Sequence, residues 1–334
     1  MSETGKLASQ DRDIVPERVA KVIRTIGHVT STVTTTIRSL TMNNAYDAPR
    51  GGLDEMSLFE LSRYIKAPSV KIPFYFAAER RMSSSQKSAK SIGAPEIIEV
   101  FNAHELASML ALTYLYKRIR TRIKEEEDWL RIQKSVEEQL EISSLLGQAL
   151  PSIGYGNAIL IGTIRPLALG LFSIIDLKGY KDYRRDLKIK DQTFNITDEK
   201  NRWGITHLDV ACRLLIQLGF GQTFASDFYH ALNSTSDLRL NDEQLRIRLT
   251  GLWIESLTIG SIPPKVRGEE KHQASNDVLD MLFDSCAQVR SAGATNCWIG
   301  KGKKDVSKSS HPALFAPSGL NNPDNHDDRE LYAE

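Results

Sequence analysis

The most apolar stretch of the 334-residue chain is Asn157–Ile175 (NAILIGTIRPLALGLFSII). A helix that is apolar on nearly every side belongs in a protein interior, so we expect this stretch to form the central core helix. Arg165 and Pro166 interrupt the run before it reaches the roughly 18 apolar residues of a membrane span, and we expect none. Because Pro166 has no N–H group, it also predicts a missing backbone hydrogen bond and a kink.

Helical patterns flank this stretch on both sides. Trp129–Leu146 carries an apolar stripe opposite a face of Lys and Glu, and Gly147 is its expected end. Thr206–Leu218 opens with the box-like pair Thr206 and Asp209 and continues as one apolar stripe. Further helices are predicted over Ser57–Ile65 (with Ser57 and Glu60 as a capping box), Pro73–Met82, Glu105–Glu127, Thr223–Leu232, Glu243–Leu257 and Asn276–Val289, and a connecting loop over Asp191–Lys200.

These patterns predict an all-α protein built as a helical bundle. Residues 1–50 are expected to form an N-terminal helical arm and linker, and residues 51–258 the helical domain. Residues 259–299 read as a C-terminal helical extension. Residues 300–334 are rich in Gly, Lys, Ser, Asn and Asp, which predicts a disordered tail.

Composition and charge make some classes of protein less favoured than others. Lys and Arg number 43 against 42 Asp and Glu, and a net charge of +1 makes a nucleic-acid or membrane-surface protein an unfavoured alternative. Three scattered cysteines lack zinc-site spacing and indicate a reducing compartment, and the polar N-terminus shows no export signal. We therefore expect a cytoplasmic protein.

No familiar catalytic motif is present. The sequence has no HExxH, His-Asp pair, CxxC, phosphate-binding P-loop or GxSxG elbow. Seven histidines occur, of which His207 and His230 lie on successive predicted helices that could bring them into one layer. For either one alone, a core or capping role is favoured over metal binding.

Taken in order, the segments resemble the HDOD domain family, the catalytically degenerate relatives of HD metal-dependent phosphohydrolases in bacterial signalling proteins. The most specific match is E-x-x-x-W-G-x-x-H-x-x-V-A, which runs from Glu199 to Ala211. Gly162–Ala168 is similar to the family's G-L-L-H-D-I-G segment, with Arg165-Pro166 where the His-Asp pair would stand. Weaker similarities lie at Ser57–Val70, Ile92-Gly93, Trp129–Leu146 and His230, so that the resemblance covers roughly residues 55–235.

The resemblance implies that residues 51–258 form an HD/HDOD-like helical bundle. It also implies a non-enzymatic signalling module that binds a protein partner or a small anionic ligand, with no metal or cofactor. A permanently charged guanidinium at residue 165 would repel a divalent cation. The degenerate cleft would be lined by Arg165, His207, His230, Glu199 and Asp209, where an anion could bind. We favour the alternative in which Arg165 pairs structurally with Glu199 or Asp209.

Three points stay open at this stage. A metal-dependent phosphohydrolase would require a rearranged site. A nucleic-acid or membrane adaptor would use the basic residues of Lys117–Lys124 and Lys301–Lys308. Met1–Gly52 could mediate a homodimer. The candidate ligands of the rearranged metal site are His104, His207, His230, Glu105, Asp209 and Asp227.

Overall fold

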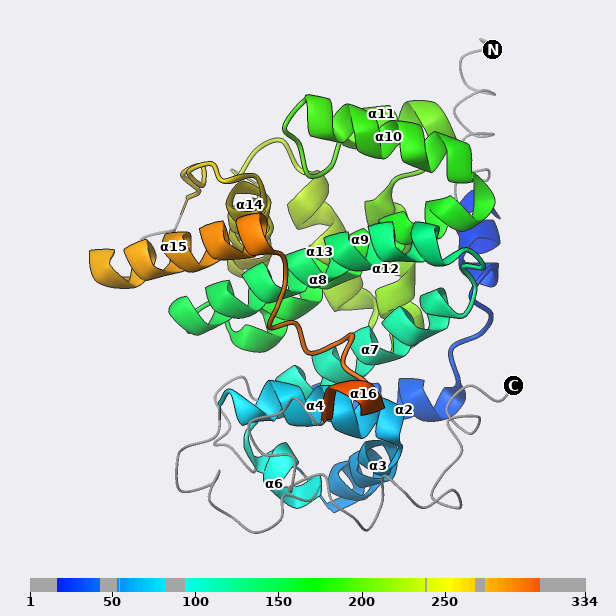
Figure 1. The fold of residues 1–334 in the computed structure, drawn as a ribbon, viewed down its shortest axis with the longest axis vertical. Helices are drawn as coiled ribbons and strands as arrows, with labels where there is room; N and C mark the ends of the chain where they lie inside the picture. The colour runs from blue at the N-terminus through cyan, green and yellow to red at the C-terminus, as the bar shows by residue number, and fades with distance from the viewer. Residues whose placement is uncertain are drawn as a thin grey trace.

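The computed structural model describes residues 17–42, 53, 55–81, 94–237, 239–267 and 274–306. Every regular element within these ranges is a helix, which confirms the predicted all-α class (Figure 1). In Figure 1, α3, α4 and α6 gather at one end of the molecule and α10 and α11 at the other, with α7, α8 and α9 between them. Residues 17–24 are helical, and the helices that follow are α2 (Ser31–Met42), α3 (Glu55–Lys66), α4 (Pro68–Glu79), α6 (Ala94–Glu99), α7 (Ala103–Arg120), α8 (Glu126–Ala149), α9 (Tyr155–Ile175), α10 (Leu177–Ile189), α11 (Ile196–Trp203), α12 (His207–Leu218), α13 (Gln222–Asn233), α14 (Asp242–Ile259), α15 (Asn276–Ala292) and α16 (Lys303–Val306).

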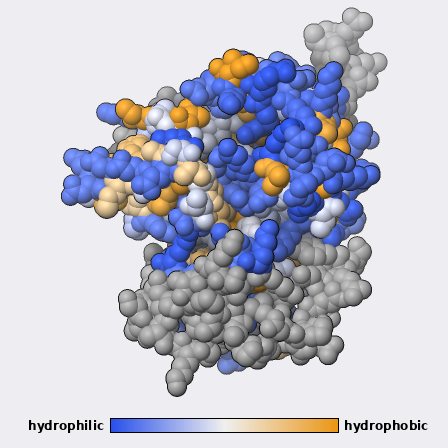
Figure 2. Space-filling view, in the orientation of Figure 1, coloured by the Kyte–Doolittle hydropathy of each residue, from blue (hydrophilic) through white to orange (hydrophobic). Residues whose placement is uncertain are grey.

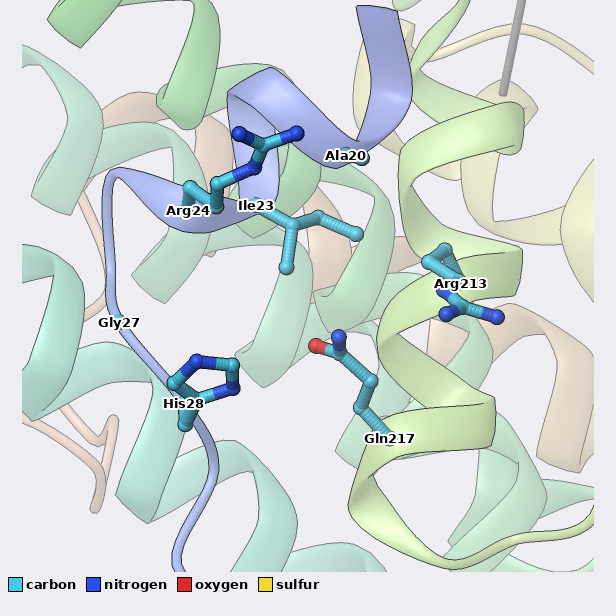
Figure 3. Close-up of a pocket in the computed structure, with 7 residues that line it drawn as sticks. All are labelled: Ala20, Ile23, Arg24, Gly27, His28, Arg213 and Gln217. Carbon is cyan, nitrogen blue, oxygen red and sulfur yellow. The ribbon is translucent and has the colours of Figure 1, made fainter. Parts of the chain in front are cut away.

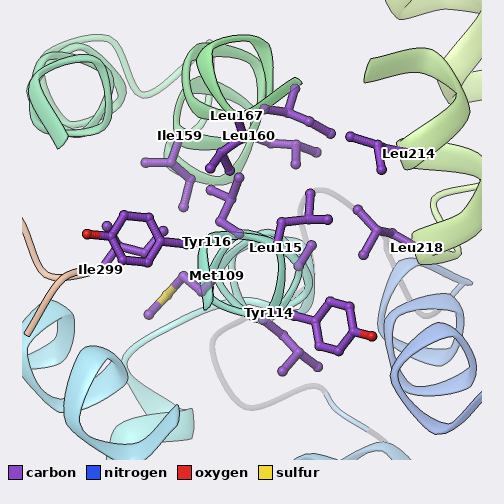
Figure 4. Close-up of a cluster of buried hydrophobic side chains, with 14 of the residues drawn as sticks. Met109, Tyr114, Leu115, Tyr116, Ile159, Leu160, Leu167, Leu214, Leu218 and Ile299 are labelled. Atoms are coloured by element: carbon purple, nitrogen blue, oxygen red, sulfur yellow. The ribbon is translucent and has the colours of Figure 1, made fainter. Parts of the chain in front are cut away.

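Helix α9 is the central helix that its composition predicts. Every residue from Tyr155 to Ser173 is buried, and α7, α8, α10, α12 and α14 pack around it. Its length and hydropathy would suit a membrane span, but 89% of its most apolar window is covered by the rest of the described fold. Figure 4 shows how leucines and isoleucines of α9 meet those of α7 and α12 in one apolar cluster. Pro166 lies inside α9, and the helix continues through it.

Two glycines allow α8 and α9 to approach closely. A Cβ atom added at Gly162 of α9 would overlap the hydroxyl of Ser143 on α8. A Cβ atom at Gly147 would lie 2.7 Å from the Cα atom of Tyr155. Gly147 therefore does not end α8, as its sequence context predicted. The helix runs on to Ala149, and the glycine provides the space in which α9 begins.

Two further local predictions are wrong. Ser57 does not cap a helix, because α3 begins at Glu55 and the Ser57 hydroxyl lies 2.7 Å from that of Ser39 on α2. Part of the predicted loop 191–200 is helical, since α11 begins at Ile196 with Asn195 as its N-cap. At α11 the cause is the Asn195 side chain, which accepts from the backbone N–H of Asp198 and so fixes the start of the helix.

The predicted terminal segments contribute to the principal core. Val33, Ile37 and Leu40 of α2 are fully buried, and α2 packs against α7 and α12. Near the other end, Trp298 and Ile299 enter the same apolar cluster, and α16 packs against α4. The first residues of the expected tail, 300–306, are therefore folded, and residues 307–334 lie outside the described residues. Polar side chains dominate the visible face of the described part (Figure 2).

Candidate functional site

Arg165 projects from the middle of α9 into a fully enclosed position. Only 3% of its side chain is exposed, and its Nη2 atom lies 2.6 Å from Oε1 of Glu255 on α14. The guanidinium also sits over the ring of Phe194, 4.2 Å from its centroid. Arg165 is thus paired with a carboxylate, as the structural alternative required, but that alternative named Glu199 or Asp209 and was wrong about the partner.

His207 opens α12 and is held by Glu199 of α11. Both side chains have no exposed surface, and the His207 Nδ1 atom lies 2.8 Å from Glu199 Oε2. The backbone N–H of His207 donates to the same carboxylate at 2.7 Å. One buried carboxylate therefore fixes both the ring and the first turn of α12.

The second ring nitrogen of His207 faces Arg165. Arg165 Nε donates to His207 Nε2 across 3.3 Å, which leaves Nε2 as an acceptor and Nδ1–H as the donor to Glu199. Phe194 completes the arrangement, because its ring stacks on the imidazole with centroids 4.2 Å apart. Both nitrogens of the imidazole are used, so neither is free to bind a ligand.

The Glu199 carboxylate is stabilised in its charged form. Burial raises the pKa of this carboxyl, but the contacts with His207 and with the hydroxyl of Tyr183 outweigh burial, so that the pKa lies below its ordinary value. Tyr183 donates to Glu199 Oε1 across 2.5 Å and accepts from the backbone N–H of Asn195. Burial and the nearby carboxylate raise the pKa of the Tyr183 hydroxyl, which therefore remains a donor.

Two of the five predicted cleft residues lie apart from this buried cluster. Asp209 caps α12, accepting from the backbone N–H of Thr206 at 2.7 Å and from its hydroxyl at 2.8 Å. His230 is exposed on α13, where its ring meets Tyr229 edge-on. The structure brings together Arg165, His207 and Glu199, and the predicted open cleft is a filled interior.

The candidate ligands of a rearranged metal site are dispersed. His104 is buried on α7 with its Nε2 atom 2.8 Å from Asn157 Oδ1, and burial lowers the pKa of its imidazole to about 4. Glu105 caps α7 and pairs with Arg81 at 2.9 Å. Within the described ranges, no three His, Cys, Asp or Glu side chains are grouped so as to hold a metal ion.

The residues around His207 do not fit a divalent cation either. A histidine binds a metal through a free nitrogen lone pair, and the Nε2 lone pair of His207 already accepts a hydrogen bond from Arg165. The guanidinium would also repel the cation. The guanidinium of Arg165 therefore occupies the place that a cation bound to His207 Nε2 would need.

Sequence reasoning missed three members of the cluster: Glu255, Phe194 and Tyr183. No local pattern connects residue 255 or 183 with residue 165, and Phe194 falls within the predicted loop. The available signal was physical: a buried arginine in an apolar helix requires a carboxylate partner. This signal predicts that a carboxylate lies beside Arg165, but it does not specify which helix supplies that carboxylate.

Comparisons with known proteins bear on the fold. No family model matches the chain, and no curated protein matches it in sequence. A crystal structure of a protein from Marinobacter aquaeolei VT8, provisionally described as a signal transduction protein, superposes with a TM-score of 0.52 at 15% sequence identity. The match covers 88% of this chain and only 66% of that one. At this identity the likeness shows a shared fold.

Proposed function

We propose that this chain is a non-enzymatic regulatory module of the HDOD type, acting in the cytoplasm through a signalling protein partner or a small anionic ligand. The helical fold and its likeness to a protein described as acting in signal transduction support this proposal. The sequence resemblance over Glu199–Ala211 adds to it, because that block forms α11 and the capped start of α12.

The observation that carries the proposal is the contact between Arg165 and His207. In an HD phosphohydrolase the corresponding histidine would bind the cation that activates water. Here its Nε2 atom accepts from a guanidinium, whose charge is already balanced by Glu255. Arg165, Glu255, His207 and Glu199 thus satisfy one another and join the helices α9, α11, α12 and α14, which supports a structural role for this cluster.

The same contacts bear on where a ligand binds. An anion that approached Arg165 would have to displace the carboxylate of Glu255, whose side chain is 32% exposed. The cost of that displacement would offset the attraction of the anion for the guanidinium. We therefore expect the Arg165 cluster to hold the fold and the ligand or partner to contact another surface.

Metal analysis of protein purified without chelators tests the proposal against the metal-dependent phosphohydrolase. We expect well under one equivalent of Mn, Fe or Zn, and hydrolysis of bis(p-nitrophenyl) phosphate no faster than that of a His207→Ala variant. His230→Ala is the matched control, because that histidine is exposed and outside the cluster. One equivalent of metal that is lost in His207→Ala would overturn the proposal, whether or not His230→Ala keeps it.

A further inference from the structure

A pocket of about 420 Å³ lies between the N-terminal helical segment and α12 (Figure 3). Its volume falls within the range of about 300–1,000 Å³ that is typical of small-molecule sites. It is separate from the buried Arg165 cluster, because no residue is shared. Its lining consists of Ala20, Ile23, Arg24, Gly27, His28, Arg213 and Gln217.

The polar lining of the pocket is basic. Arg24 comes from the N-terminal segment and Arg213 from α12, so the two facing walls each supply an exposed guanidinium. Within the described part of the chain, neither arginine forms an ion pair with a carboxylate. Beside the pocket, Arg118 and Arg122 approach Gly27 with their guanidinium groups. Positive charge therefore gathers here although the whole chain is nearly neutral.

Gln217 adds an unsatisfied acceptor. Its Oε1 atom is buried and has no hydrogen-bond partner among the described residues, and the side chain extends from α12 toward the centre of the pocket (Figure 3). A buried acceptor of this kind calls for an N–H or O–H donor. Ile23 and Ala20 supply an apolar surface beside it.

We propose that this pocket binds a small organic phosphate of nucleotide size. The phosphate group would lie between Arg24 and Arg213, because a guanidinium offers paired N–H donors that match phosphate oxygens. A turn of the Gln217 amide would bring its buried Oε1 atom to the pocket, where a hydroxyl or amine of the ligand would donate to it. The apolar side of its ring would pack on Ile23.

Such a ligand would join two segments that are distant in sequence. The N-terminal segment is held to the core by Arg18, which donates to the carbonyl of Trp203, and by Arg118, which donates to that of Ile26. A bound phosphate adds a bridge from this segment to α12, the helix that begins at His207. The inference deepens the regulatory function proposed above by naming the class of ligand and its site.

Calorimetric titration of the full chain with AMP, GMP, CMP, UMP and inorganic phosphate tests the inference. At least one nucleotide should bind saturably with one site per chain. Arg24→Ala and Arg213→Ala should each weaken that binding about tenfold or more, the usual effect of losing a charge-assisted hydrogen bond. Gln217→Leu should lower the affinity for the nucleotide and leave the affinity for inorganic phosphate unchanged.

Lys21→Ala is the matched control. Lys21 is exposed on the same helical segment as Arg24 but does not line the pocket, so its removal should change the affinity less than threefold. Absence of saturable binding by all five compounds would overturn the inference, as would equal weakening by Lys21→Ala and Arg24→Ala. Either result leaves the regulatory function standing, whereas a stoichiometric metal lost in His207→Ala would overturn that function and not the pocket.

Discussion

Arginines occupy two regions of this molecule with opposite surroundings. Arg165 is buried between α9, α12 and α14, and its donors face Glu255 and His207. Arg24 and Arg213 are exposed across a pocket and have no carboxylate partner among the described residues. An arginine in the core must be satisfied by the protein itself, because an unpaired buried charge costs several kcal/mol of stability. At the surface, water can satisfy an arginine until a ligand does.

The largest effect that separates the two regions is expected for Arg165→Ala. This change leaves a cavity in the core, an unpaired Glu255 carboxylate and an unpaired Nε2 atom on His207. We expect the free energy of unfolding to fall by about 3 kcal/mol, measured in urea. A loss below about 1 kcal/mol would mean that the buried cluster does not hold the helices together.

The second effect concerns His104, another polar side chain in the core. Its pKa is about 4 in the folded state against 6.5 as the ordinary value, so the unfolded chain binds a proton first as the pH falls. Stability should therefore decrease below pH 6.5 and level off near pH 4, by a total on the order of 3 kcal/mol. His104→Gln retains a donor for Asn157 and should flatten this dependence. An unfolding free energy, measured in urea, that falls as much in His104→Gln as in the unchanged chain between pH 6.5 and pH 4 would contradict the assignment.

A smaller effect is expected at the start of α12, where the two regions share a helix. Thr206 caps α12 through the backbone N–H of Asp209 and is almost fully buried. Thr206→Ala should cost about 1 kcal/mol in unfolding free energy, whereas Thr206→Ser should keep most of the cap. Equal losses in the two variants would show that the methyl group matters and the capping hydroxyl does not.

The smallest effect is expected in the pocket. Arg213→Ala removes an exposed side chain without a carboxylate partner in the described part, so the unfolding free energy should change by less than about 0.5 kcal/mol. Thermal unfolding of Arg213→Ala and Arg165→Ala under the same conditions compares the two losses of stability directly. A destabilisation comparable with that of Arg165→Ala would mean that Arg213 is a structural residue and not a ligand contact.

The helices could be predicted from sequence because each one carries its own signal. The apolar composition of Asn157–Ile175 and the pair Thr206 and Asp209 predicted α9 and the start of α12 correctly. Gly147 was misleading, since a glycine can end a helix or admit a neighbouring one, and only the packing of α8 on α9 decides which.

The candidate site was predicted only in part. Glu199 and His207 lie eight residues apart, and the family resemblance placed them together. Glu255 and Phe194 come from other parts of the chain, and no periodicity specifies which carboxylate meets Arg165. The basic pocket was missed for the same reason: Arg24 and Arg213 become neighbours only when the N-terminal segment packs against α12.

The most direct test of the central claim is an NMR measurement of the His207 ring nitrogens in 15N-labelled protein, assigned by their loss in His207→Gln. The claim is that Arg165 occupies the position of a cation. We predict a neutral ring with its proton on Nδ1, and 15N shifts that stay unchanged when Zn²⁺ is added. A proton on Nε2, or a large Zn²⁺-dependent shift of that nitrogen, would contradict the account.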